Sequence, residues 1–318
     1  MIYIYFLSDN ERKKLLKGYL PKSREQGVAE ELRGWNWHQP PLEPVYEVLL
    51  PLYQIAGKYC DSGRDVFLNK VGKYKGKPNT AMLLGTLFHS LIAFMLVRTK
   101  KLIYLYGTNI EMISQELNGA LKEFLENSAD VYQQLSEASD CQDKDRVTST
   151  AKECLEQLFN YEYYRITSRI QDILSRQPYI GEDSLAAQAV PFILEQNLDG
   201  SFLGLSSNLH ADAYVFSEPM IIDLKFGTRE PFHRLTTTGY ALVMEALYDY
   251  PINVGCIVYG EFKKGRLYIQ KDFHIINDEL RQWFIEERDE KMRMVYNEID
   301  PGKATNCDEK CPYFTVCS

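Results

Sequence analysis

The sequence lacks an excess of positive charge. Its 318 residues include 36 Lys and Arg against 44 Asp and Glu, which gives a net charge of −8. This balance excludes a protein that coats duplex nucleic acid through charge alone. Basic residues do gather locally, as in residues 70–77, so the sequence remains compatible with a local basic groove.

The sequence also lacks a secretory signature and a long uninterrupted apolar run. No charged start, apolar core and small-residue cleavage site follow one another near residue 1. The longest apolar run, residues 81–97, contains Thr86, His89 and Ser90 and is at the short end of what spans a bilayer. We therefore expect a cytoplasmic protein without membrane association, in which this run forms a buried helix.

Seven cysteines, an odd number, do not indicate a disulfide framework. Three of them, Cys307, Cys311 and Cys317, lie within eleven residues near the C-terminus, where a tail has little core to join. The spacing predicts a metal site, with Cys60 as a candidate fourth ligand. Thiolates select zinc or an iron–sulfur cluster, and the missing second C-x2-C pair favours the cluster over a zinc ribbon. A metal-free tail is the alternative.

Hydrophobic periodicity changes near residue 178, from helical spacing to strand spacing. Upstream, short helices are expected at 52–60 and 64–71, followed by an apolar helix capped by Thr80 and a helical region over 108–176. Downstream, the pattern predicts strands at 187–196, 211–216, 220–226, 253–259 and 266–274, with helices at 236–248 and 277–299. This order predicts an α/β sandwich with a mixed sheet. The expected divisions are an N-terminal region (1–79), a helical subdomain (80–178), a core that contains the sheet (179–276) and a C-terminal helix and tail (277–318).

The strand at 220–226 carries the residues with the clearest chemistry. Because side chains at i and i+2 share a face of a strand, Asp223 and Lys225 point the same way. Pairing this strand with residues 211–216 as a hairpin would bring Asp212 to the same place. Two close carboxylates require a cation between them, and oxygen ligands suit Mg²⁺ or Mn²⁺. The alternative is an ordinary Asp–Lys pair on a half-exposed strand.

These features occur in a fixed order along the chain: Cys60, His89, Asp212, Asp223-x-Lys225, Tyr240, and then Cys307, Cys311 and Cys317. In this order they resemble the RecB-like nucleases of the PD-(D/E)xK superfamily. Within that superfamily they are most similar to the iron–sulfur nucleases associated with CRISPR adaptation, in their archaeal type I-A variant. The resemblance implies a restriction-endonuclease-like mixed sheet flanked by helices, with a helical insertion and an iron–sulfur-bound tail.

The resemblance also implies residue roles. It implies a Mn²⁺ or Mg²⁺ ion held by His89, Asp212, Asp223 and the carbonyl of Leu224. It implies catalytic roles for Lys225, Asp223, Asp212 and Tyr240, and a [4Fe-4S] cluster on Cys60, Cys307, Cys311 and Cys317. Thr236 stands where the family usually has Gln, and the first gap between the tail cysteines is three residues instead of two.

The implied function is metal-dependent cleavage of single-stranded DNA, as an exonuclease that processes spacer precursors for the CRISPR adaptation integrase proteins. Lys225 would then stabilise charge on the phosphate. Trp35, Trp37 and Tyr313 are candidates for stacking on exposed bases, although the two tryptophans are also typical core anchors. The alternative function is a non-catalytic subunit that binds DNA or the integrase.

Overall fold

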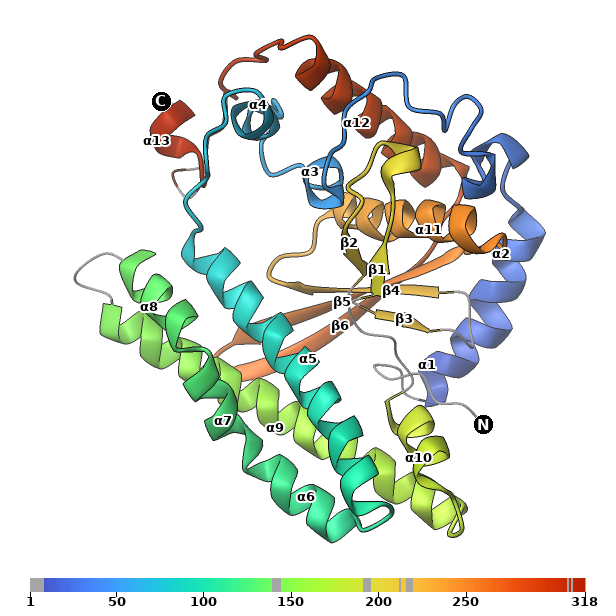
Figure 1. Cartoon of the computed structure of the whole chain (residues 1–318), viewed down its shortest axis with the longest axis vertical. Helices are drawn as coiled ribbons and strands as arrows, with labels where there is room; N and C mark the ends of the chain where they lie inside the picture. Colours follow the sequence, from blue (N-terminus) through green and yellow to red (C-terminus); the bar gives the residue numbers. More distant parts are fainter. Residues whose placement is uncertain are drawn as a thin grey trace.

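A four-stranded mixed sheet lies at the centre of the computed structural model, which describes residues 9–138, 144–190, 196–211, 213–215, 220–307, 309 and 311–317 (Figure 1). The strand order is β3-β4-β5-β6, and the strands are β3 (Ala213–Val215), β4 (Met220–Phe226), β5 (Val254–Lys263) and β6 (Arg266–Ile275). Only β4 and β5 run parallel among the described neighbours; β3 with β4 and β5 with β6 are antiparallel. The predicted α/β class with a mixed sheet is therefore confirmed.

The two antiparallel pairs follow from local sequence. Ala213 lies opposite Ile222, so the predicted pairing between the 211–216 and 220–226 runs is confirmed. The β5–β6 connection is Lys264 and Gly265, whose φ angles are 50° and 67°. Positive φ at both positions gives a two-residue turn whose twist matches that of the strands it joins.

Helices cover both faces of the sheet, which explains why β4 is apolar on both sides. Helix α11 (Arg234–Tyr248) connects the parallel strands β4 and β5, and it lies with α12 (Asp278–Tyr296) and α3 (Leu52–Ala56) over one face (Figure 1). Helices α5 (Thr80–Tyr106) and α9 (Lys144–Arg176) cover the other face.

Strand β4 alternates between two hydrophobic cores. Met220, Ile222 and Leu224 belong to the core on the α5 side, whereas Ile221 belongs to the core on the α11 side. Side chains two apart along β4 therefore face the same helical layer.

The α5 helix is long and apolar enough to cross a membrane by length and composition. In the fold, its Leu87, Leu91 and Met95 are buried against the rest of the larger core. One face of the expected buried helix therefore lies in the core, whereas Val97 and Tyr104 on the same helix are exposed. The helices α6 (Ile110–Asn118), α7 (Ala120–Asn127), α8 (Ala129–Ala138) and α10 (Glu182–Ala189) complete this layer.

The remaining elements are short or peripheral. They are α1 (Asp9–Lys14), the π-helical η1 (Leu15–Tyr19), α2 (Leu20–Gln26), η2 (Glu30–Leu32), η3 (Gly34–Asn36), α4 (Arg64–Lys70), β1 (Gln196–Leu198), η4 (Ser201–Leu203), β2 (Leu209–Ala211), η5 (Pro231–His233) and α13 (Phe314–Cys317).

Two local predictions are wrong. The strand expected at 187–196 is helical up to Ala189, because Leu185, Ala186 and Ala189 bury one face of α10 in the core. The cap of α5 is Asn79 and not Thr80, since the Asn79 side chain accepts the N–H of Met82 from an extended backbone position. Residues 191–195 lie outside the described part, and the four-part domain division stays a prediction.

Candidate active site

A carboxylate and an ammonium group lie side by side near the carboxyl end of β4. Asp223 is 3% exposed, Lys225 is half-buried, and Lys225 Nζ lies 3.0 Å from Asp223 Oδ2. By strand alternation both side chains share the face of Ile221, the α11 side of the sheet. The structure thus places the two charges next to each other, as their i, i+2 spacing predicts.

A buried histidine lies beside this pair. His233 is 4% exposed and ends η5, immediately before α11. Its Nε2 lies 2.9 Å from the hydroxyl of Tyr59, and its Nδ1 lies 3.1 Å from the hydroxyl of Tyr259. Tyr259 is the register partner of Lys225 on the neighbouring parallel strand.

The charge state of this histidine follows from its surroundings. Burial, followed by the positive charge of Lys225, lowers the pKa of His233 to about 4. Burial, followed by the carboxylate of Asp272, raises the pKa of Tyr259 to about 12. Near pH 7 the imidazole is therefore neutral and the Tyr259 phenol is protonated. A neutral imidazole has one donor and one acceptor nitrogen, so it accepts from one tyrosine hydroxyl and donates to the other.

Two arginines bind one carboxylate further along the α11 side of the sheet. Arg234 donates from Nε and Nη2 to Asp272 at 2.8 and 2.9 Å, and Arg229 Nη2 lies 2.8 Å from Asp272 Oδ1. Burial opposes ionisation of Asp272, but the hydrogen bonds from Arg234 outweigh it and lower the pKa of this carboxyl. Two cations on one carboxylate leave a net positive charge at the start of α11.

The structure brings His89 to the end of β4, but on the α5 side. Its ring lies edge-to-face against Phe226, with 5.5 Å between the ring centroids. Phe226 packs against the α5-side core, on the face opposite to Asp223 and Lys225 by strand alternation. Asp212, the other predicted side-chain ligand, lies outside the described residues.

Tyr240 and Thr236 both lie on α11. Tyr240 is largely buried in the core on that side, and Thr236, one turn earlier, is half-buried. Leu224, whose carbonyl is a predicted metal ligand, is a buried member of β4. The predicted roles of these three residues stay predictions.

The donor types near β4 suit a hard cation. Asp223 offers a buried carboxylate and His89 an imidazole at the same end of the strand, and such O and N donors bind Mn²⁺ or Mg²⁺. Within the described part of the chain, no three His, Cys, Asp or Glu side chains lie close enough together to hold a metal ion. The predicted metal ligation by His89, Asp212 and Asp223 therefore stays a prediction.

The segment that carries Cys60 is docked against the C-terminal tail. The Lys77 backbone N–H donates to the Pro312 carbonyl at 3.0 Å, and the Ser62 hydroxyl donates to the Gly302 carbonyl at 2.8 Å. Figure 1 shows α13 near the connection between α4 and α5. The tertiary structure thus brings together two stretches that are more than two hundred residues apart in the sequence.

The four predicted cluster cysteines belong to these two stretches, and all four are free thiols. Burial raises the pKa of Cys311, and the neighbouring thiols of Cys60 and Cys307 raise it further. Arg64 Nη1 lies 3.4 Å from the Cys317 Sγ. The thiol donors fit a soft metal or an iron–sulfur cluster by type, but within the described residues no three of these thiols lie close enough together to hold a metal ion, so the cluster stays a prediction.

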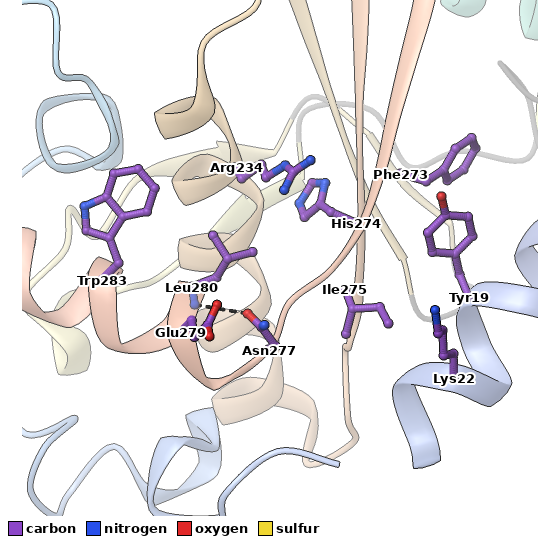
Figure 2. A pocket seen from close by; sticks show the side chains of 10 residues that line it. All are labelled: Tyr19, Lys22, Arg234, Phe273, His274, Ile275, Asn277, Glu279, Leu280 and Trp283. Carbon is purple, nitrogen blue, oxygen red and sulfur yellow. Dashed lines mark hydrogen bonds between the residues drawn. The ribbon is translucent and has the colours of Figure 1, made fainter. Parts of the chain in front are cut away.

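A separate cavity lies beyond the arginine end of the site (Figure 2). It has a volume of about 490 Å³ and is lined by Tyr19, Lys22, Arg234, Phe273, His274, Ile275, Asn277, Glu279, Leu280 and Trp283. Figure 2 shows Arg234 and His274 between Trp283 on one side and the Tyr19–Phe273 pair on the other. Its described lining includes none of the predicted site residues.

Sequence reasoning missed His233, Tyr59, Tyr259 and the arginine pair on Asp272. One signal was present in the sequence. Residues 227–234 follow the carboxyl end of the buried strand β4, which pairs in parallel with β5, and α/β folds place polar groups at this end of their parallel strands. Tyr59 gave no comparable signal, because its partner is 174 residues away.

Comparison with known proteins extends over nearly the whole chain. Residues 6–318 match the family model described as "CRISPR-associated exonuclease Csa1". A protein of that name from Saccharolobus solfataricus is 30% identical over 93% of this chain and 94% of its own length. Another of that name, from Thermoproteus tenax, is 27% identical over 92% of this chain and 93% of its own. No solved structure matches the chain.

Proposed function

Because the chain belongs to the Csa1 family of CRISPR-associated exonucleases, we propose that it is a metal-dependent nuclease that degrades single-stranded DNA. The names of its relatives support a nuclease role in CRISPR systems. The observation that carries the proposal is the buried Asp223 carboxylate 3.0 Å from Lys225 at the end of β4. This pairing of charges serves phosphodiester hydrolysis, where negative charge develops on phosphate oxygens.

The chain supplies defined groups for this reaction. Asp223, His89, Asp212 and the Leu224 carbonyl are the donors proposed for Mn²⁺ or Mg²⁺. When bound, such an ion polarises the phosphate and lowers the pKa of a water molecule. The Lys225 ammonium interacts with a phosphate oxygen from the half-exposed side of the pair, and Tyr240 on α11 is proposed to support it. The β3–β4 hairpin and the parallel strand β5 agree with the proposed PD-(D/E)xK core.

The cysteines serve a structural role in this proposal. A [4Fe-4S] cluster on Cys60, Cys307, Cys311 and Cys317 would join the α3–α4 connection to the tail; the Ser62 hydroxyl in that connection already donates to the Gly302 carbonyl after α12. The biological setting proposed is the cytoplasm, where the enzyme trims spacer precursors for the CRISPR adaptation integrase proteins.

Substitution of Lys225 tests the catalytic assignment. We expect Lys225→Met and Asp223→Asn to lower Mn²⁺-dependent degradation of single-stranded DNA by about 100-fold or more, the usual effect of removing one transition-state contact. Lys263→Met is a matched control, because Lys263 pairs at 2.7 Å with Glu261 in the same i, i+2 arrangement on β5. Folded variants of both residues that cleave at the wild-type rate would refute the assignment.

The same assay separates the second candidate function. A non-catalytic subunit binds single-stranded DNA or the integrase without any metal-dependent cleavage. Strong binding by the wild-type protein, with no product under Mn²⁺ or Mg²⁺, would favour that function over hydrolysis.

A further inference from the structure

One aromatic ring is exposed to solvent next to the Asp223–Lys225 pair. Tyr59 lies in the connection between α3 and α4 and is 76% exposed. Its hydroxyl lies 2.9 Å from Nε2 of the buried His233, whose Nδ1 lies 3.1 Å from the hydroxyl of Tyr259, the register partner of Lys225 on the neighbouring strand. The exposed ring and the catalytic pair therefore occupy one site.

Buried groups hold this exposed ring in a fixed orientation. The hydroxyl is hydrogen-bonded at 2.9 Å to Nε2 of His233, which is 4% exposed and is itself fixed by Tyr259 through Nδ1. The Tyr59 and Phe232 rings pack edge-to-face, with 5.0 Å between their centroids and 87° between their planes. Two contacts of different kinds thus restrain the ring, although most of its surface remains free for a ligand.

The two tryptophans considered from the sequence as stacking platforms make contacts with other side chains of this chain. Trp35 donates from Nε1 to Glu30 at 2.7 Å, and the guanidinium of Arg33 lies 5.3 Å from the centre of its ring. Trp37 packs against Phe202, with 5.5 Å between ring centroids. Their contacts are those of anchors for the N-terminal segment, whereas Tyr59 is an exposed aromatic residue beside the catalytic pair.

We infer that Tyr59 stacks on a base of single-stranded DNA next to the phosphate at Asp223 and Lys225, with His233 and Phe232 as positioning residues. This inference rests on the proposed nuclease function for the identity of the phosphate site. A ring already fixed before binding loses little conformational entropy when a base stacks on it. Bases of a duplex are already stacked on both sides, so such a ring selects single strands.

The magnitude follows from the energy of stacking. A base on an aromatic side chain contributes about 1 to 3 kcal/mol, equivalent to roughly a 5- to 150-fold change in Kd. We expect Tyr59→Ala to weaken binding of a short, fluorescently labelled oligothymidylate by that factor. The full-length protein is titrated into the oligonucleotide, and binding is followed by the fluorescence anisotropy of the label. The buffer contains EDTA, so that no cleavage occurs. Tyr59→Phe keeps the ring and should retain most of the affinity. Tyr179→Ala, at a fully exposed tyrosine in the turn after α9, is the matched control.

Abasic substitutions distinguish stacking from a purely structural role. Single abasic sites are placed in turn along the oligonucleotide. For the wild type, an abasic site at one position should weaken binding by roughly the factor seen with Tyr59→Ala. For Tyr59→Ala, an abasic site at the same position should cause no further loss of affinity. His233→Phe should reduce this position-specific effect to the same small extent as Tyr59→Phe, because each variant removes the same hydrogen bond.

Two results would overturn the inference: wild-type affinity in folded Tyr59→Ala, or equal losses at the stacking position in wild type and variant. Because binding is measured without metal, the outcome is independent of catalysis. If Lys225→Met cleaves normally, the proposed site fails while the stacking result is still read on its own. If Lys225→Met is inactive but Tyr59→Ala binds normally, only the present inference fails.

Discussion

Removal of the buried Glu245 carboxylate should destabilise the fold more than removal of a carboxylate from an exposed ion pair does. Glu245 lies on α11 and is 0% exposed. Its two oxygens accept from Arg281 at 2.7 and 2.8 Å and from Arg33 at 2.9 Å, and they also accept the backbone N–H groups of Gly34 and Ile252 at 2.9 and 3.0 Å. This one side chain thus ties α11 to η3, to α12 and to the segment before β5.

The expected cost follows from what remains after the change. In Glu245→Ala the guanidinium of Arg281, also 0% exposed, keeps its charge in the core without its carboxylate. Breaking one side of a buried pair costs about 3 to 5 kcal/mol. With an unfolding entropy of about 2.1 cal/mol/K per residue over 318 residues, this corresponds to a fall in Tm of roughly 5 to 8 °C.

The control is an ion pair of the same type on the surface. Glu290 and Arg293 form a 2.8 Å pair on α12, with 65% of the Glu290 side chain exposed. Such pairs contribute about 1 kcal/mol or less, so Glu290→Ala should change Tm by no more than about 2 °C. Differential scanning calorimetry of both variants makes the comparison. Equal and small changes in Tm for the two variants would show that the buried ion pairs of Glu245 do not contribute the expected stabilisation.

The pH dependence gives a second check on the same residue. Burial opposes ionisation of Glu245, but the hydrogen bonds and charge of Arg281 outweigh it and lower the pKa of the carboxyl. A lowered pKa in the folded state means that the contribution of Glu245 is complete above its unfolded value of about 4.3 and is lost as the pH falls through the folded value. The difference in Tm between wild type and Glu245→Ala should therefore shrink in acid, and a difference that grows there contradicts the argument.

Three further predictions concern the cysteines, a close backbone contact and the proposed metal site. Protein purified anaerobically should bind iron and show broad visible absorbance that Cys311→Ser reduces and Cys154→Ser does not; a colourless, zinc-containing wild type would refute the cluster. Gly34→Ala should lower the free energy of unfolding by about 1 to 3 kcal/mol in denaturant titrations, since an added Cβ would clash with the Leu242 carbonyl oxygen; an unchanged midpoint would show that η3 moves away freely. His89→Ala should raise the Mn²⁺ concentration needed for half-maximal cleavage while Tm stays within a few degrees; an unchanged Mn²⁺ dependence removes His89 from the metal site.

Local sequence patterns predicted the parts of the fold that depend on neighbouring residues. The β4 strand, its hairpin partner and the two-residue turn at Lys264 and Gly265 follow from side-chain alternation and backbone preference. The Asp223–Lys225 contact follows from the period of two along a strand. The failure at residues 187–189 has the same origin, because a short apolar run is compatible with both a strand and a helix until its packing partner is known.

The sequence by itself thus determined the central strands, the acidic and basic pair on β4, the cysteine-rich tail and the resemblance to a nuclease family. Only the tertiary structure decided that Tyr59 meets His233 across 174 residues, and that Glu245 joins Arg33 and Arg281 in the core. The physical reason is range. Strand alternation and turn geometry act over a few residues. A buried hydrogen bond between distant segments forms only when both cores have packed and excluded water from the donor and the acceptor.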